Sequence, residues 1–187
     1  MRLSFATFSV ELQSCQSRRD LDDLLKAFEG PRELIESTHG PANSFYILKL
    51  TPQIDDTSVT DRYLGICASR TGIEPQTLVD ARHELLYVGL DSSVLIVQRT
   101  SATKVISLDG CFYSMTLFPG ADGVLVVHEI GILWLAPNGQ VDWRYDTDII
   151  ARVALSTPQT LDVKLLEGHK TTVDLSNGKV LSGTVRN

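Results

Sequence analysis

Three similar segments in the second half of the chain restrict its fold more than any other feature. Residues 94–110, 124–139 and 161–178 each begin with an apolar-alternating run and end at a glycine, after which another such run follows. The three segments are nearly equal in length, but the distances between their glycines differ. Repeated hairpins with insertions in the loops between them have this property. We therefore expect tandem antiparallel β-meanders over this half and not a catalytic α/β core.

Each of the three glycines follows an aspartate or an asparagine, in the dipeptides Asp109-Gly110, Asn138-Gly139 and Asn177-Gly178. Such dipeptides are favoured in two-residue type I′ turns, in which both central residues have positive φ. The sequence therefore predicts a tight hairpin turn at each of them. From residue 78 onward, short apolar runs alternate with turn residues, as they do in sandwiches, barrels and propellers.

Two stretches around these turns, WLAPNGQVDW (134–143) and VDLSNGKVLSG (173–183), resemble the quinoprotein-type (PQQ-like) β-propeller repeat, and ISLDGCFY (106–113) resembles it more distantly. The resemblance covers about residues 81–187. It implies blade-like sheets but neither a quinone nor an enzyme activity, since such blades also occur in proteins without either. A closed propeller needs about four to eight blades, and this region holds only about two and a half. The resemblance therefore implies an open or partly closed array, unless several chains complete a ring.

The N-terminal part contains the clearest helix signal, over residues 18–29. Ser17 lies three residues before Asp20, which is typical of a helix N-terminus. Apolar residues follow at positions i, i+3, i+4 and i+7, as Leu21, Leu24, Leu25 and Phe28. Pro31 is favoured at a first helical position and predicts a second short helix to about residue 38. The apolar stripe of the first helix needs a partner, and a sheet face is the natural one.

The expected fold class is mainly β, α+β overall, with tandem antiparallel meanders that resemble propeller blades and an amphipathic N-terminal helix packed on the sheet. Residues 1–80 form an α+β segment with a strand, the helix over 18–29 and further strands. Residues 81–187 form the meander region. We expect the two regions to fold as one cooperative unit.

Composition restricts the partners and the compartment. The formal net charge of -6 argues against a nucleic-acid partner, which would require a basic stripe, but it suits a basic protein partner. No apolar run approaches the roughly 18 residues of a membrane helix, and no signal peptide is expected. Cys15, Cys67 and Cys111 are far apart and form no CxxC pair. Isolated cysteines are typical of a reducing compartment, so a cytoplasmic location is predicted, with no membrane and no nucleic acid as partner.

No motif identifies a catalytic, cofactor-binding or metal-binding residue. His83 and Glu84 begin an HExxH pattern, but Tyr87 stands where the second histidine must be. The nucleophile elbow, the P-loop and the dinucleotide-binding glycine pattern are all missing from the sequence. A small hydrolase-like enzyme that uses one of the four histidines stays open as an alternative. The histidines are His39, His83, His128 and His169.

Two sets of residues are candidates for a protein interface. Strand alternation places Trp143 and Tyr145 on one face, with Trp134 across the Asn-Gly turn, and this face is either core or an interface anchor. Asp22 and Asp23 on the helix are either solvated or contact a basic partner. We therefore predict a non-catalytic protein-binding module, immunity-like or adaptor-like, with no cofactor. Besides the enzyme, the alternative is a subunit of an oligomeric propeller-like assembly, and the sequence leaves the oligomeric state open.

Overall fold

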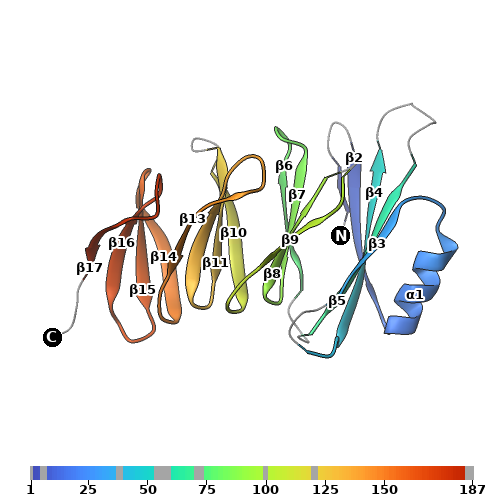
Figure 1. The fold of residues 1–187 in the computed structure, drawn as a ribbon, viewed down its shortest axis with the longest axis horizontal. Helices are drawn as coiled ribbons and strands as arrows, with labels where there is room; N and C mark the ends of the chain where they lie inside the picture. The colour runs from blue at the N-terminus through green and yellow to red at the C-terminus, as the bar shows by residue number, and fades with distance from the viewer. Residues whose placement is uncertain are drawn as a thin grey trace. The chain divides into compact units, whose positions relative to one another are not determined.

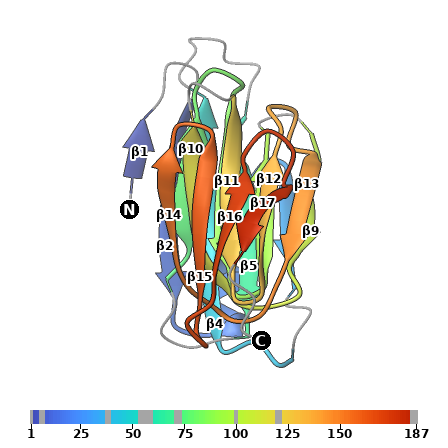
Figure 2. The same ribbon diagram turned by 90° about the vertical axis from the view of Figure 1, so that its left-hand side faces the viewer.

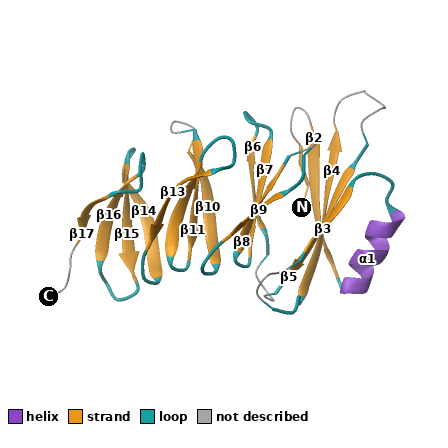
Figure 3. Ribbon diagram, viewed as in Figure 1, coloured by secondary structure: helices purple, strands orange, loops and turns teal. Residues whose placement is uncertain are grey.

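The computed structural model describes residues 2–4, 8–36, 40–52, 60–69, 74–98, 101–118 and 122–183. The chain divides into two compact units. The first is Met1–Glu74 with Gln98–Ala102, and the second is Pro75–Val97 with Thr103–Asn187. The predicted fold class is confirmed, since the described residues form antiparallel meanders and one amphipathic helix that packs on a sheet (Figures 1 and 3). No helix among these residues has the length and apolar character needed to cross a membrane.

The first unit is a five-stranded sheet with the helix packed on it. Its strands lie in the order β1-β2-β4-β5-β3, and all neighbours are antiparallel except β3 and β5. Its elements are β1 (Arg2–Ser4), β2 (Phe8–Cys15), α1 (Arg18–Ala27), β3 (Arg32–Ile35), β4 (Ser44–Pro52) and β5 (Arg62–Ala68).

Helix α1 forms where the apolar stripe predicts it and ends two residues earlier, at Ala27. The Ser17 hydroxyl accepts the backbone N–H of Asp20 at 3.1 Å and caps the helix. Leu21 and Leu25 are buried in a cluster that also contains Ile47, Tyr63 and Cys67. Gly65 of β5 lies beneath them, where a Cβ atom would be 2.7 Å from Leu25 Cδ1. The missing side chain therefore lets the helix approach the sheet.

The second helix predicted from Pro31 is wrong. Arg32–Ile35 form strand β3, which pairs in parallel with β5, from Arg32 opposite Tyr63 to Ile35 opposite Ile66. The backbone N–H of Tyr63 also donates to the carbonyl of Pro31 at 2.9 Å. A helix of one or two turns gains little by itself, so a ladder of hydrogen bonds to a neighbouring strand outweighs the local preference of the proline.

The described part of the second unit holds three consecutive four-stranded antiparallel sheets, here called blades 1, 2 and 3. The sequence allowed for only about two and a half. Blade 1 contains β6 (Gln76–Asp80), β7 (Leu85–Leu90), β8 (Ser93–Val97) and β9 (Lys104–Ser107). Blade 2 contains β10 (Phe112–Phe118), β11 (Gly123–His128), β12 (Gly131–Leu135) and β13 (Val141–Asp146). Blade 3 contains β14 (Ile150–Thr157), β15 (Thr160–Leu165), β16 (Lys170–Asp174) and β17 (Val180–Gly183).

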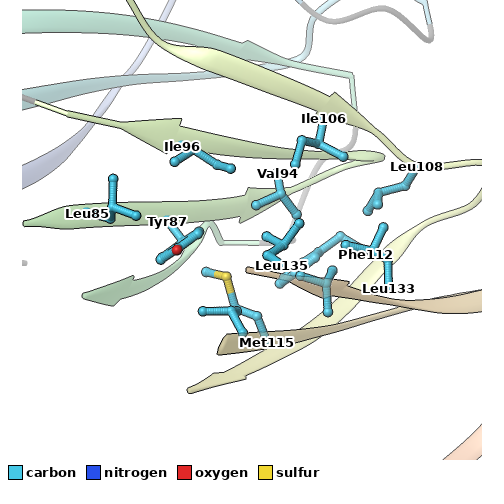
Figure 4. Close-up of a cluster of buried hydrophobic side chains, with 12 residues drawn as sticks. Leu85, Tyr87, Val94, Ile96, Ile106, Leu108, Phe112, Met115, Leu133 and Leu135 are labelled. Atoms are coloured by element: carbon cyan, nitrogen blue, oxygen red, sulfur yellow. The ribbon is translucent and has the colours of Figure 1, made fainter. Parts of the chain in front are cut away.

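Consecutive blades pack face to face, and blade 2 is apolar on both faces. Because successive side chains of a strand point to opposite faces, Val124 and Val126 of β11 join the cluster with blade 1. Leu125 and Val127 join the cluster with blade 3. Figure 4 shows labelled side chains of blades 1 and 2 converging in the first of these clusters.

The predicted domain boundary after residue 80 falls between β6 and β7, which are paired strands of blade 1. Strand β6 therefore belongs to the second compact unit. Cooperative unfolding of the whole chain stays a prediction.

Only two of the three predicted turns are hairpins, and neither is of type I′. Asn138-Gly139 joins β12 to β13, and Asn177-Gly178 joins β16 to β17. The φ angle is positive at Gly139 (69°) and Gly178 (71°) but not at the asparagines. A single left-handed glycine after a turn is typical of hairpin loops longer than two residues, which is what these five-residue connections are.

The third dipeptide, Asp109-Gly110, lies between β9 and β10 and joins blade 1 to blade 2. The first repeated segment is therefore out of phase with the other two. It begins in the third strand of its blade, whereas residues 124 and 161 lie in second strands. A turn dipeptide indicates a local backbone conformation but not which strands it connects.

Replacement of Gly65 by alanine is expected to destabilise the protein by about 1–3 kcal/mol, because the new methyl group overpacks the helix–sheet contact. Urea denaturation followed by circular dichroism measures the loss. Gly183→Ala is the matched control, since the nearest atom to its Cβ position is 3.5 Å away. An equal effect of the two substitutions would contradict close packing at Gly65.

Candidate functional site

A cleft of about 560 Å³ lies in the second unit, where the turns of blade 3 meet the last strands of blade 2. It combines an apolar part with a polar, acidic part. The lining residues are Trp134, Asp142, Pro158, Gln159, Thr160, Asp174, Leu175, Ser176 and Leu181.

Two β-bulges at matching places of blades 2 and 3 supply lining residues to this cleft. Asp142 is the extra residue of β13, and Leu181 is the extra residue of β17. A bulge leaves one residue out of the ladder and re-aims its side chain. The flanking pairs are Trp134–Trp143 and Leu135–Val141 in blade 2, and Thr172–Ser182 and Val173–Val180 in blade 3.

A pair of tryptophans holds blade 2 against blade 3 beside the cleft. The rings of Trp134 and Trp143 are nearly parallel, with centroids 6.1 Å apart, and both are buried. The indole N–H of Trp143 donates to the carbonyl of Leu175 at 2.9 Å. Gly178 lies against the same indole, where a Cβ atom would be 2.7 Å from Cε3. These contacts fix the position of the β16–β17 loop that lines the cleft.

Both predicted tryptophans therefore take the core role that the sequence left open, and only Trp134 reaches the cleft. Tyr145 is half-buried and packs against the same core. Asp22 and Asp23 lie on α1 in the first unit, where Arg18 pairs with Asp22 at 3.0 Å and Arg19 with Asp23 at 3.8 Å. An interface role for any of these residues stays a prediction.

The cleft carries negative charge. The Asp174 carboxylate accepts hydrogen bonds from the hydroxyl of Ser176 at 2.7 Å and from its backbone N–H at 2.8 Å. These bonds lower the pKa of Asp174, so it is ionised at neutral pH. Asp142 is exposed and has no ion pair among the described residues. The lining residues include no lysine, arginine or histidine to balance the two carboxylates.

None of the three described histidines lines the cleft, and His39 lies outside the described residues. His83 accompanies Asp80, whose carboxylate contacts its Nδ1 at 2.6 Å and also accepts its backbone N–H. This pair closes the β6–β7 turn, so the HExxH-like segment is turn and strand and not a helix. The described residues contain no group of three or more potential protein ligands for a metal.

His128 of β11 is fully buried, and neither of its ring nitrogens has a hydrogen-bond partner among the described residues. Its ring lies over Gly131, where a Cβ atom would be 2.7 Å from Nε2. Burial lowers the pKa of His128, and the nearby positive charge of Arg144 acts in the same direction. The folded protein therefore holds this imidazole neutral. It is part of the core and not a solvent-accessible base.

Sequence reasoning missed the acidic and apolar residues of the cleft. A signal was present, because Asp142 and Leu181 each stand three positions after the glycine of an Asn-Gly turn. That spacing repeats between the two blades, but the side-chain types differ, so residue identity alone does not reveal it.

No protein-family model matches the chain, and no curated protein matches it in sequence. Solved structures do resemble it. BamB from Moraxella catarrhalis is 17% identical, with 56% of this chain and 35% of that chain covered and a TM-score of 0.38. The WD40 β-propeller domain of Doa1 is 12% identical, with 80% and 67% covered and a TM-score of 0.35. Apo AztD from Citrobacter koseri is 11% identical, with 98% and 57% covered and a TM-score of 0.48.

The match with BamB thus spans about a third of that protein, and the match with AztD just over half. The second unit is propeller-like in its own geometry, with three antiparallel four-stranded meanders packed face to face.

The buried His128 predicts a loss of stability on acidification. The pKa of His128 is lower in the folded protein than in the unfolded chain, where it is about 6.5. Its contribution to the free energy of unfolding is therefore complete above the unfolded-state pKa and is lost as pH falls toward the folded-state pKa. His128→Leu is expected to make the free energy of unfolding less dependent on pH between 7 and 5. Urea denaturation at each pH measures this. His169→Gln, in the β15–β16 turn, should keep the wild-type dependence, and an unchanged dependence in His128→Leu would contradict the assignment.

Proposed function

We propose that this chain is a non-catalytic protein-binding module that takes a basic segment of a partner protein in the cleft between blades 2 and 3. The observation that carries the proposal is the pair of matching bulges, which bring Asp142 and Leu181 into one cleft. An immunity-like or adaptor-like role suits a module of this kind with a net charge of -6.

The chemistry of the cleft favours a lysine or arginine side chain as the bound group. Leu181 and Pro158 offer apolar surface to the methylene stem, while Asp142 and Asp174 face the cationic head. Long basic side chains pack in this way, with the stem on apolar surface and the charge at a polar edge. Hydrogen bonds within the β16–β17 loop hold the Asp174 carboxylate in place, so little ordering of this carboxylate is required on binding.

Catalysis is the weaker interpretation of the same cleft. Its lining residues include neither histidine nor cysteine, and the hydroxyl of Ser176 donates to Asp174. The Asp174 carboxylate is a poor general base, because its pKa is lowered by the same hydrogen bond, and none of the described histidines lies beside the hydroxyl to take its proton. The Asp80–His83 pair, which resembles part of a catalytic constellation, is used to close a turn.

Ring assembly by a further blade is also less favoured. Asp162, Lys164 and Thr172 stand on the outer face of blade 3 at the places where blade 2 has Leu125, Val127 and Trp134. The blade 2 residues form the core with blade 3. A blade stacked on the outer face of blade 3 would bury charges without forming such a core.

Two finer assignments also belong to this proposal. The quinoprotein-type identity of the repeat is supported by the WLAPNGQVDW and VDLSNGKVLSG stretches, which form matching β-hairpins. A cytoplasmic location is supported by Cys15, Cys67 and Cys111, which are all free thiols.

Selection from a library of displayed peptides tests the proposal. Peptides with lysine or arginine beside an apolar residue should be enriched on the wild-type protein. For a synthetic peptide so selected, Asp142→Asn and Leu181→Ser should each weaken binding about tenfold, measured by fluorescence anisotropy. Asp148→Asn, at an exposed aspartate outside the cleft, is the control and should have little effect. Failure to enrich any peptide, or equal affinity for the cleft variants, would contradict the proposal.

A further inference from the structure

Three cations stand side by side across blade 3. Arg152 of β14 lies directly opposite Lys164 of β15, and Lys164 lies directly opposite Lys170 of β16. Side chains opposite one another on neighbouring strands have Cβ atoms about 4.5–5.5 Å apart. All three residues are exposed. Figure 2 shows their strands adjacent at the front of the view. We call Arg152, Lys164 and Lys170 the basic row.

The basic row lies on the outer face of blade 3. Leu161, Val163 and Leu165 of β15 are buried in the core with blade 2, so alternation sends Lys164 to the opposite face. Blades 2 and 3 share the bulge that precedes this row in their first strands. The equivalent row of blade 2 is Ser114, Val127 and Ile132. Val127 and Ile132 of the blade 2 row pack in the core with blade 3, whereas all three positions of the blade 3 row are cationic.

A row of three cations is not needed to keep the outer face of blade 3 exposed to water. Like charges directly opposite on neighbouring strands destabilise a sheet, and mixed or neutral polar side chains would solvate the face without repulsion. Asp162 pairs with Lys170 at 2.7 Å, and alternation places Asp174 further along the same face, so two carboxylates share the face with three cations. Arg152 and Lys164 have no ion pair in the described parts of the chain. In a chain of net charge -6, this face is locally positive.

We propose that the outer face of blade 3 is a second binding surface, which takes an acidic segment of a partner protein along the basic row. Arginine binds carboxylates through two parallel hydrogen bonds, and lysine adds flexible point charges. The row spans two strand spacings, about 10 Å, which suits two carboxylates at alternate positions of an extended segment, roughly 7 Å apart. Nucleic acid and anionic membranes fit less well, because three cations on an acidic chain supply few phosphate contacts.

Binding of a fluorescein-labelled peptide of alternating glutamate and serine to the full chain tests the proposal. At low ionic strength, Lys164→Gln and Arg152→Gln should each weaken binding about three- to tenfold, measured by anisotropy. Lys179→Gln, an exposed lysine of the same blade outside the row, should change it less than twofold. Unchanged binding in both row variants, or an equal loss in Lys179→Gln, would overturn the proposal.

A second readout separates a binding role from a structural one. If the row is kept for a ligand at a cost to the fold, Lys164→Gln should raise the melting temperature by about 1–3 °C at low salt. The difference should shrink at high salt, because salt screens the repulsion. A lower melting temperature would mean that Lys164 supports the fold and would count against the proposal.

Three competing ligands test the assignment to a protein segment. Inorganic phosphate, single-stranded DNA and vesicles with anionic lipid should compete more weakly than the acidic peptide. Tighter binding of any of them, lost in Lys164→Gln, would overturn that assignment. These outcomes are independent of the cleft, because Asp142→Asn and Leu181→Ser should leave binding of the acidic peptide unchanged.

Discussion

Burial of apolar faces between consecutive blades is the interaction on which the second unit depends. Blade 2 is the centre of this arrangement, because Val124 and Val126 face blade 1 while Leu125 and Val127 face blade 3. Each buried aliphatic side chain contributes about 1.5–3 kcal/mol, whereas a single hydrogen bond contributes about 1 kcal/mol. Polar contacts between blades, such as Lys104 to the Gly139 carbonyl and Trp143 to the Leu175 carbonyl, therefore orient the blades more than they hold them together.

Both faces of blade 2 are committed to packing, so the binding features proposed for the second unit lie at strand ends and on the outer face of blade 3. The two bulges illustrate this, because they leave Asp142 and Leu181 outside the ladder and direct them into the cleft. The basic row illustrates it in another way. It stands where blade 2 uses apolar residues to contact its neighbour, and blade 3 has no described neighbour on that face. One repeated scaffold thus presents an acidic cleft and a basic face.

Much of the local structure was predictable, because it depends on residues close together in the sequence. The stripe that begins at Leu21 forms helix α1, which ends at Ala27, and the strands of the second half follow from short apolar runs between turn residues. The turn at Asp109-Gly110 was misplaced because its residues do not show that β9 ends one sheet and β10 begins the next. Strand β3 was missed because it pairs with β5, which is far away in the chain. The cleft was not predictable for the same reason, since it joins Trp134 to Pro158 and to Leu181.

The amino-acid sequence is enough to predict a mainly β chain with one amphipathic helix and glycine turns at Gly139 and Gly178, and it contains no catalytic or metal-binding motif. These properties follow from local backbone preference and from the burial of apolar side chains. The tertiary structure decided the phase of the repeat, the core role of the tryptophans, the bulges and the alignment of Arg152 with Lys164. Strand register decides all four, because a shift of one residue moves every side chain of a strand to the opposite face.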